Sequence, residues 1–169
     1  VTGALNSAQS TNDNTMFLIG VANYRRPRGR IEIAERTGLD RARFATLVHP
    51  LASVSPRATI ARGVAIFQYA VVSDASVIRD HALISPLSFI GHHAAIGTGA
   101  VLAPRSSVLG GSTIGDGCYI GASAVVKDGV IVSDGSVVGM GAIVVDDVAP
   151  DAIVVGNPAG VMSRSTEPG

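Results

Sequence analysis

Histidines are the residues of this chain best suited to moving protons near neutral pH. The sequence contains four of them, His49, His81, His92 and His93. Imidazole changes its charge close to physiological pH, so a histidine can take a proton from an attacking hydroxyl or amine and pass it on. His49 adjoins a proline and is expected to be structural, and His81 follows Asp80 and is expected at the surface. The adjacent pair His92 and His93 is left as the candidate for acid–base chemistry.

An aliphatic residue recurs at every sixth position, and the elements built on this repeat must position any such site. Cutting the chain every six residues gives seventeen first positions, all of them aliphatic. They are Val48, Val54, Ile60, Ile66, Val72, Ile78, Ile84, Ile90, Ile96, Leu102, Val108, Ile114, Ile120, Val126, Val132, Val138 and Val144. The fifth position is small or β-branched throughout, from Ala52 to Ala142. An internal repeat of fixed period is typical of a solenoid.

A period of six residues fits neither a helical stripe nor an ordinary half-buried strand, whose periods are 3.6 and 2 residues. A triangular prism does fit, with one short strand and one corner per hexad and three hexads per coil. The aliphatic residue then points inward, and stacked coils bury a continuous ladder. The alternative is a β-sandwich with Gly-rich turns, but sandwich strands vary in length and their loops break register. We predict a mostly β fold, a left-handed parallel β-helix of hexapeptide repeats over residues 48–145.

The chain before the repeat has a different pattern. Residues 1–47 are expected to form a small, partial α/β segment. The expected elements are a loop over Val1–Thr15, a buried strand over Met16–Val21 and a helix over Arg28–Thr37 that ends at Gly38.

The chain after the repeat is expected to close the prism. Residues 146–169 include Pro150 and Pro158, and proline cannot continue a central strand. We expect a cap over the open end of the prism, followed by a polar tail from Ser163.

The composition argues against several classes of function. Formal net charge is zero and charged residues make up 15% of the chain, so neither phosphates nor anionic lipids would be attracted over distance. The single cysteine, Cys118, excludes an internal disulfide and a CxxC metal pair. No apolar run reaches the length of a membrane span, and the N-terminus lacks the pattern of a signal peptide. We expect a cytoplasmic protein with no nucleic-acid partner, no membrane partner and no metal.

Local motifs at both ends of the repeat resemble one family. They are Ile19-Gly20 with Asn23 and Arg25, the pair His49-Pro50, the run Ile90-Gly91-His92-His93, and the run Val155-Gly156-Asn157-Pro158-Ala159. Together with the hexads, they resemble the bacterial left-handed β-helix sugar acetyltransferases that act on bacillosamine precursors, perosamine and sialic acid. The resemblance implies an acyl-CoA-dependent acyltransferase that moves an acetyl group from acetyl-CoA to the amino group of a nucleotide-linked amino sugar. A sugar or sialic acid O-acetyltransferase is the alternative, because the same base serves a hydroxyl.

The resemblance also implies roles for individual residues. His92 matches the position of the catalytic histidine and would be the general base. Gly110 would hold the thioester, and the backbone at Ala122 and Met140 would contact coenzyme A in the groove between two prisms. Because that groove needs two subunits, the resemblance implies a homotrimer. Gly20 would lie at the edge of the sugar-nucleotide site.

The chain departs from the family pattern at three places. His93 stands where an acidic residue usually follows the catalytic histidine, and Val101 replaces a second histidine that normally helps to hold the acyl donor. The Gly-rich strand-to-helix turn of the family's N-terminal domain is not found before Met16. We therefore expect only part of that domain, and the acceptor sugar is less well supported than the acyl transfer.

The prism adds a geometric argument of its own. Residues 18 apart stack on the same edge, so Asp74, His92 and Gly110 are predicted to form a column. The backbone amides of Gly110 and Gly111 would lie one coil from the imidazole and could hold the thioester carbonyl, because glycine lets a ligand approach the backbone closely. Asp74 would lie one coil to the other side, where it could orient or polarise His92.

Two other functions compete with the acyltransferase. Some prisms of this fold hold a metal through three histidines on two faces, but His81, His92 and His93 do not have that spacing. A catalytically weak or non-catalytic trimeric scaffold is the second alternative, since a fold does not imply a function. The partial N-terminal segment, His93 and Val101 favour the scaffold somewhat.

Overall fold

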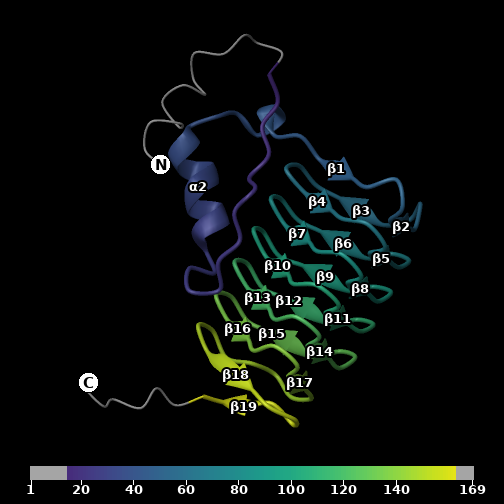
Figure 1. Ribbon diagram of the computed structural model, residues 1–169, viewed down its shortest axis with the longest axis vertical. Helices are drawn as coiled ribbons and strands as arrows, with labels where there is room; N and C mark the ends of the chain where they lie inside the picture. The colour runs from purple at the N-terminus through teal and green to yellow at the C-terminus, as the bar shows by residue number, and fades with distance from the viewer. Residues whose placement is uncertain (1–14, 163–169) are drawn as a thin grey trace.

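The structure is a computed structural model that describes residues 15–162 of the 169-residue chain. The loop expected over Val1–Thr15 and the tail from Ser163 lie outside the described residues, apart from Thr15. The rest of the chain winds into a prism with one short helix beside it (Figure 1). Within the described residues, no helix is long and apolar enough to cross a membrane.

Three parallel sheets form the faces of the prism. The first face contains β1 (Leu47–Val48), β4 (Ala65–Ile66), β7 (Leu83–Ile84), β10 (Val101–Leu102), β13 (Tyr119–Ile120), β16 (Val137–Val138), β18 (Ile153–Val155) and the antiparallel β19 (Gly160–Val161). The second face contains β2 (Ser53–Val54), β5 (Val71–Val72), β8 (Phe89–Ile90), β11 (Ser107–Val108), β14 (Val125–Val126) and β17 (Ile143–Val144). The third face contains β3 (Thr59–Ile60), β6 (Val77–Ile78), β9 (Ala95–Ile96), β12 (Thr113–Ile114) and β15 (Ile131–Val132).

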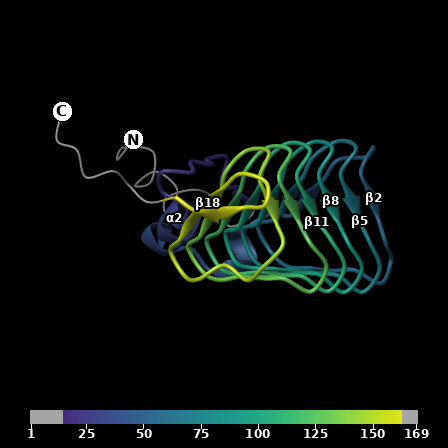
Figure 2. The same ribbon diagram turned by 90° about the horizontal axis from the view of Figure 1, so that it is seen from below.

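The predicted coil of 18 residues is confirmed by the strand register. Val101 pairs with Leu83 in the coil before it and with Tyr119 in the coil after it. Figure 2 shows the coils stacked one behind another around a common interior. The predicted left-handed parallel β-helix is therefore the fold of this chain.

The interior of the prism is the aliphatic ladder that the repeat predicts. Ile78, Ile84 and Ile90 have no exposed surface, and the small fifth-position residues beside them, such as Ala82, are equally buried. Burying one such aliphatic side chain stabilises the fold by about 1.5–3 kcal/mol. Val48 is 44% exposed because it belongs to the first coil, which has no coil stacked before it.

Every corner from Gly63 to Gly141 turns at the fourth residue of its hexad. Each of these residues has a positive φ, between 52° and 73°. Residues other than glycine lose roughly 1–2 kcal/mol in this left-handed region, and half of the positions are glycines. The positions are Gly63, Tyr69, Ala75, His81, Leu87, His93, Gly99, Arg105, Gly111, Gly117, Ser123, Gly129, Gly135 and Gly141. We call the bend between the first and second faces the first corner, and name the second and third corners in chain order.

The C-terminal cap begins with a shortened coil. The hexads were expected to stop near Val144, but β18 still pairs in parallel with β16. Val137 pairs with Ile153, so this coil is two residues shorter than the others. The strand β19 then turns back and pairs antiparallel with β18, which ends the parallel stack.

The N-terminal segment contains the predicted helix but not the predicted strand. The helix α2 (Gly29–Thr37) ends at Gly38, whose left-handed backbone forms the C-cap. A short 3₁₀ turn, η1 (Arg41–Arg43), follows. The strand expected over Met16–Val21 was wrong, because only Phe17 forms a single parallel bridge, to Phe44.

Arg30 joins the helix to the prism. Its side chain is buried, and the guanidinium donates to the backbone oxygens of Ile19 and Val21 at 2.8 Å and of His81 at 2.7 Å. One cation therefore ties together the helix, the segment before it and the third corner. Burial lowers the pKa of Arg30 to about 10, which leaves the group charged at neutral pH.

His81 lies inside this junction, which contradicts the surface position expected for it. Its ring is buried and meets Phe44 edge-on at a centroid distance of 4.5 Å. A Cβ at Gly63 would lie 2.4 Å from His81 Nδ1, so only glycine leaves room for the imidazole. Burial lowers the pKa of His81, against the raising effect of Asp80 and with the help of Arg30 and Arg41.

The buried His81 predicts a loss of stability in mild acid. An unfolded histidine titrates near pH 6.5, and the folded pKa of His81 lies below that value. As the pH falls through about 6.5, the unfolded chain therefore binds the proton first, and stability declines until the folded pKa is passed. The urea concentration at the unfolding midpoint should fall as the pH is lowered from about 8 to about 5. Most carboxylates titrate below this range.

The matched variant is His81→Asn, because asparagine tolerates a positive φ and does not titrate. In this variant the urea midpoint should depend less on pH between about pH 8 and about pH 5. An equal slope in wild type and variant would assign the acid sensitivity to another group.

Candidate active site

His92 and His93 form the second corner, directly after β8. They occupy the third and fourth positions of their hexad, which lie outside the ladder, and both side chains are exposed. His93 is the turning residue of this corner and has a φ of 57°. The repeat thus places two imidazoles side by side at the surface.

The two imidazoles contact each other through a single pair of nitrogens. The Nδ1 atoms lie 3.1 Å apart, and the rings meet edge-on with centroids 5.3 Å apart. A neutral imidazole has one donor and one acceptor nitrogen. At this distance one Nδ1 must carry hydrogen and the other must accept it.

The predicted column of Asp74, His92 and Gly110 is confirmed by the backbone. The His93 N–H donates to the Asp74 carbonyl at 2.9 Å, and the Gly111 N–H donates to the His92 carbonyl at 2.8 Å. The His92 ring lies over Gly110, where an added Cβ would be 2.6 Å from Cε1 and 2.7 Å from Nε2. The imidazole can take this position because residue 110 has no side chain.

The Gly110 and Gly111 amides, predicted to hold the thioester carbonyl, both have hydrogen-bond partners within the chain. The Gly110 N–H donates to Asp128 Oδ1 at 2.8 Å, and the Gly111 N–H is engaged by the His92 carbonyl. Neither amide is free to donate to a thioester carbonyl in this structure. The physical reason is that the stacking of coils uses the corner amides.

Asp74, which could orient or polarise His92 from the neighbouring coil, directs its side-chain hydrogen bonds to the coil before it. Arg57 donates through Nε and Nη2 to the two carboxylate oxygens of Asp74, and Ser55 donates to the same group at 3.2 Å. The hydrogen bond from Arg57 is the main cause that lowers the pKa of Asp74, and a weaker contribution comes from His93. Asp74 is thus anchored to the coil before it, and its charge interacts mainly with Arg57 and only weakly with His93.

Ala122 and Met140 lie at a different corner. Both follow strands of the first face, β13 and β16, and so occupy the first corner. The Ala122 carbonyl accepts from the Gly141 N–H at 2.8 Å, and the Met140 side chain is 84% exposed. The second face separates this corner from His92, so one prism does not bring the two sets of residues together.

Gly20 and Val101 are likewise not brought to His92. Gly20 is exposed, and a Cβ there would meet no atom within 4 Å. Val101 is buried on the first face, between Leu83 and Tyr119. Val101 therefore packs in the body of the protein and does not stand beside the two imidazoles.

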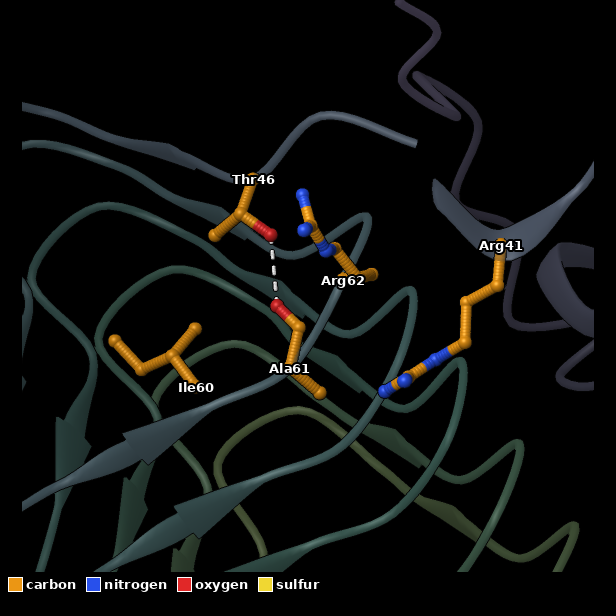
Figure 3. A pocket seen from close by; sticks show the side chains of 5 residues that line it. All are labelled: Arg41, Thr46, Ile60, Ala61 and Arg62. Atoms are coloured by element: carbon orange, nitrogen blue, oxygen red, sulfur yellow. Dashed lines mark hydrogen bonds between the residues drawn. The ribbon is translucent and has the colours of Figure 1, made fainter. Parts of the chain in front are cut away.

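Two recesses of the prism lie away from the second corner. Figure 3 shows one near its first coils, lined by Arg41, Thr46, Ile60, Ala61 and Arg62. A second, mostly apolar one is lined by Leu18, Leu47, Val48, His49, Ala65, Ile66 and Phe67. His92 and His93 line neither of these two recesses. Among residues 15–162, no group of three histidine, cysteine or acidic side chains could hold a metal ion.

Sequence reasoning missed Asp128, Arg57 and Ser55. A signal for Asp128 was present, because it lies 18 residues after Gly110 and so belongs to the same column. Arg57 and Ser55 flank the preceding position of that column. Their hydrogen bonds to Asp74 depend on side-chain conformations that the repeat does not determine.

The chain matches known proteins through its repeat and its fold. Residues 112–145 match the family described as the hexapeptide repeat of succinyl-transferase. No curated protein sequence matches the chain significantly. Among solved structures, PerB from Caulobacter crescentus, in complex with CoA and GDP-perosamine, is 25% identical with a TM-score of 0.84, over 95% of this chain and 75% of PerB. The chain is a left-handed β-helix protein of the hexapeptide-repeat type.

Two further structures share the fold. WeeI from Acinetobacter baumannii is 24% identical with a TM-score of 0.80, over 94% of this chain and 76% of WeeI. The acetyltransferase domain of PglB from Neisseria gonorrhoeae is 24% identical with a TM-score of 0.76, over 96% of this chain and 93% of that domain. The resemblance to sugar acetyltransferases of this fold, expected from the sequence, is confirmed.

Gly110→Ala should displace the His92 ring without unfolding the prism. The new methyl group would collide with Cε1 and Nε2, and the exposed imidazole can swing outward. Any activity that depends on His92 should fall by about 10²-fold, the usual effect of a misplacement near 1 Å. Ring signals of His92 in NMR spectra should shift, while those of His49 should not.

The control is Gly29→Ala, where the added Cβ would make an ordinary 3.5 Å contact with Arg26. Unshifted His92 signals in Gly110→Ala would show that the ring does not rest on Gly110.

Proposed function

We propose that this protein transfers the acetyl group of acetyl-CoA to the amino group of a nucleotide-linked amino sugar, with His92 as general base. The observation that carries the proposal is an exposed imidazole at the second corner of a prism whose fold matches PerB, a protein crystallised with CoA and GDP-perosamine. The acetyltransferase domain of PglB, crystallised with acetyl coenzyme A, shares the same fold.

The chemistry needs one proton to be relayed through His92. The amine nitrogen attacks the thioester carbonyl carbon, a C–N bond forms and the C–S bond breaks. His92 Nε2 takes the proton that the amine loses and returns it to the sulfur of CoA, which leaves as the thiol. Gly110 supports this role, because a side chain there would fill the space beside Nε2. Gly20, open on its outer side, is proposed at the edge of the acceptor's nucleotide.

We also propose that the active form is a homotrimer. His92 lies at the second corner and the proposed CoA contacts Ala122 and Met140 lie at the first, so a complete site needs the second corner of one prism beside the first corner of another. Exposed apolar side chains at the first corner support such a contact. They include Leu51, Phe67, Tyr69 and Leu87.

A trimeric scaffold without catalysis is the second candidate. The observation in its favour is that the Gly110 and Gly111 amides are both engaged within the chain, so neither is available for the thioester carbonyl. Calorimetry with CoA separates the two, since the enzyme must bind CoA and a pure scaffold need not.

His92→Ala tests the base directly. Thiol release from acetyl-CoA, followed with a panel of nucleotide-linked amino sugars, should show a kcat lower by about 10²-fold or more, the usual size of general-base effects. His49→Ala is the matched control, because His49 Nδ1 accepts from the Leu51 N–H of its own turn. Near-normal turnover of the His92→Ala variant would remove His92 as the base.

Mixing two inactive variants tests the shared site. His92→Ala lacks the base, and Ala122→Trp should block the groove from the other side. If each site combines two chains, a refolded equal mixture should regain about a quarter of native activity, because one site in four pairs an intact His92 with an intact Ala122. A mixture as inactive as its components would place both residues in sites within one chain, and sedimentation would report whether trimers form at all.

A further inference from the structure

We propose that His93 is a positioning residue that stabilises the imidazolium form of His92 by accepting a hydrogen bond at Nδ1. The inference rests on the proposed function, in which His92 takes the proton of the acceptor. It assigns a role to His93, which stands where an acidic residue usually follows the catalytic histidine.

The geometry offers such an acceptor as soon as His92 is protonated. An imidazolium carries hydrogen on both nitrogens, so His92 Nδ1 is then a donor. His93 Nδ1 lies 3.1 Å away and is its only hydrogen-bond partner among the described residues. A hydrogen bond from a charged donor is roughly twice as strong as a neutral one. His93 therefore stabilises His92 most in the protonated form, which appears only as the proton is transferred.

The same contact allows two arrangements of hydrogen before the reaction. If His92 Nδ1 carries the hydrogen, Nε2 has a free lone pair and can act as a base. If His93 Nδ1 carries it instead, His92 must hold its own hydrogen on Nε2 and cannot accept another. Only the first arrangement is reactive, and it continues into the imidazolium without any movement of His93.

The backbone holds His93 in place for this role. Its N–H donates to the Asp74 carbonyl at 2.9 Å, and Arg57 and Ser55 hold the Asp74 side chain. The His92 carbonyl in turn accepts from the Gly111 N–H. Each imidazole is thus supported by a neighbouring coil, His93 by the coil before it and His92 by the coil after it.

The proposal accounts for the residue type at this position. Its φ of 57° restricts the corner to residues that tolerate a left-handed backbone. Histidine tolerates it and brings a neutral acceptor.

Substitutions at His93 test the proposal. In His93→Ala, kcat should fall by about tenfold with KM little changed, because only the transition state loses an interaction. The backbone accepts alanine here, since Ala75 occupies the equivalent position one coil earlier with a φ of 52°. His93→Asp should recover most of the rate, because its carboxylate also accepts from Nδ1. His93→Lys, which offers only donors, should not.

A second measurement is independent of activity. Nitrogen-15 NMR of the protein without substrates reports which nitrogen of His92 carries hydrogen. His93→Ala should increase the share of the Nε2–H form of His92, and His93→Asp should reverse this change. An unchanged tautomer ratio and unchanged kcat in His93→Ala would overturn the proposal. A third outcome separates the two proposals. If His93→Ala shifts the His92 tautomer but His92→Ala keeps full activity, the contact between the imidazoles is real and the proposed function fails.

Discussion

The aliphatic ladder inside the prism is the interaction on which the rest of the structure depends. One coil has no core of its own, and Ile78, Ile84 and Ile90 become fully buried only because coils stack on both sides. The ladder requires each inward side chain to return to the same place after 18 residues. Every corner must therefore bend within a few residues, and the left-handed backbone at the fourth position of the hexad supplies that bend. Chemistry is thereby confined to the corners, outside the ladder.

A corner residue in this fold is held by the coils above and below it more than by its own coil. His92 rests on Gly110 in the next coil, and the backbone of His93 is held by Asp74 in the previous one. The same stacking engages the corner amides, which is why Gly110 donates to Asp128 and not outward. A prism of this kind offers exposed side chains along an edge but few free backbone donors. The shortage of free backbone donors favours sites that are shared between two prisms. The separation of His92 from Ala122 within one prism favours such sites as well.

The junction of the helix with the prism follows a different rule. Arg30 is a buried cation that donates hydrogen bonds to three backbone oxygens, and His81 is a buried imidazole against Phe44. Burying such groups costs free energy unless they are hydrogen-bonded, and removing a partner would leave a charge unpaired. Polar groups of this kind contribute orientation more than stability, since they hold the segment before the helix and the third corner in one arrangement.

The period of six residues was sufficient to predict the prism, its 18-residue coil, its buried ladder and the column of Asp74, His92 and Gly110, because a repeat leaves only one way to stack. The helix ending at Gly38 followed from an equally local signal. The strand over Met16–Val21 was wrong because a short apolar run forms a strand only if a partner strand lies beside it, and Phe17 finds a single residue, Phe44. The tertiary structure alone decided four other features. They are the burial of His81, the Arg57–Asp74 ion pair, the engagement of the Gly110 and Gly111 amides, and the contact between His92 and His93. Each depends on which side chains from neighbouring coils compete for the same hydrogen bond or the same space, and that competition has no period in the sequence.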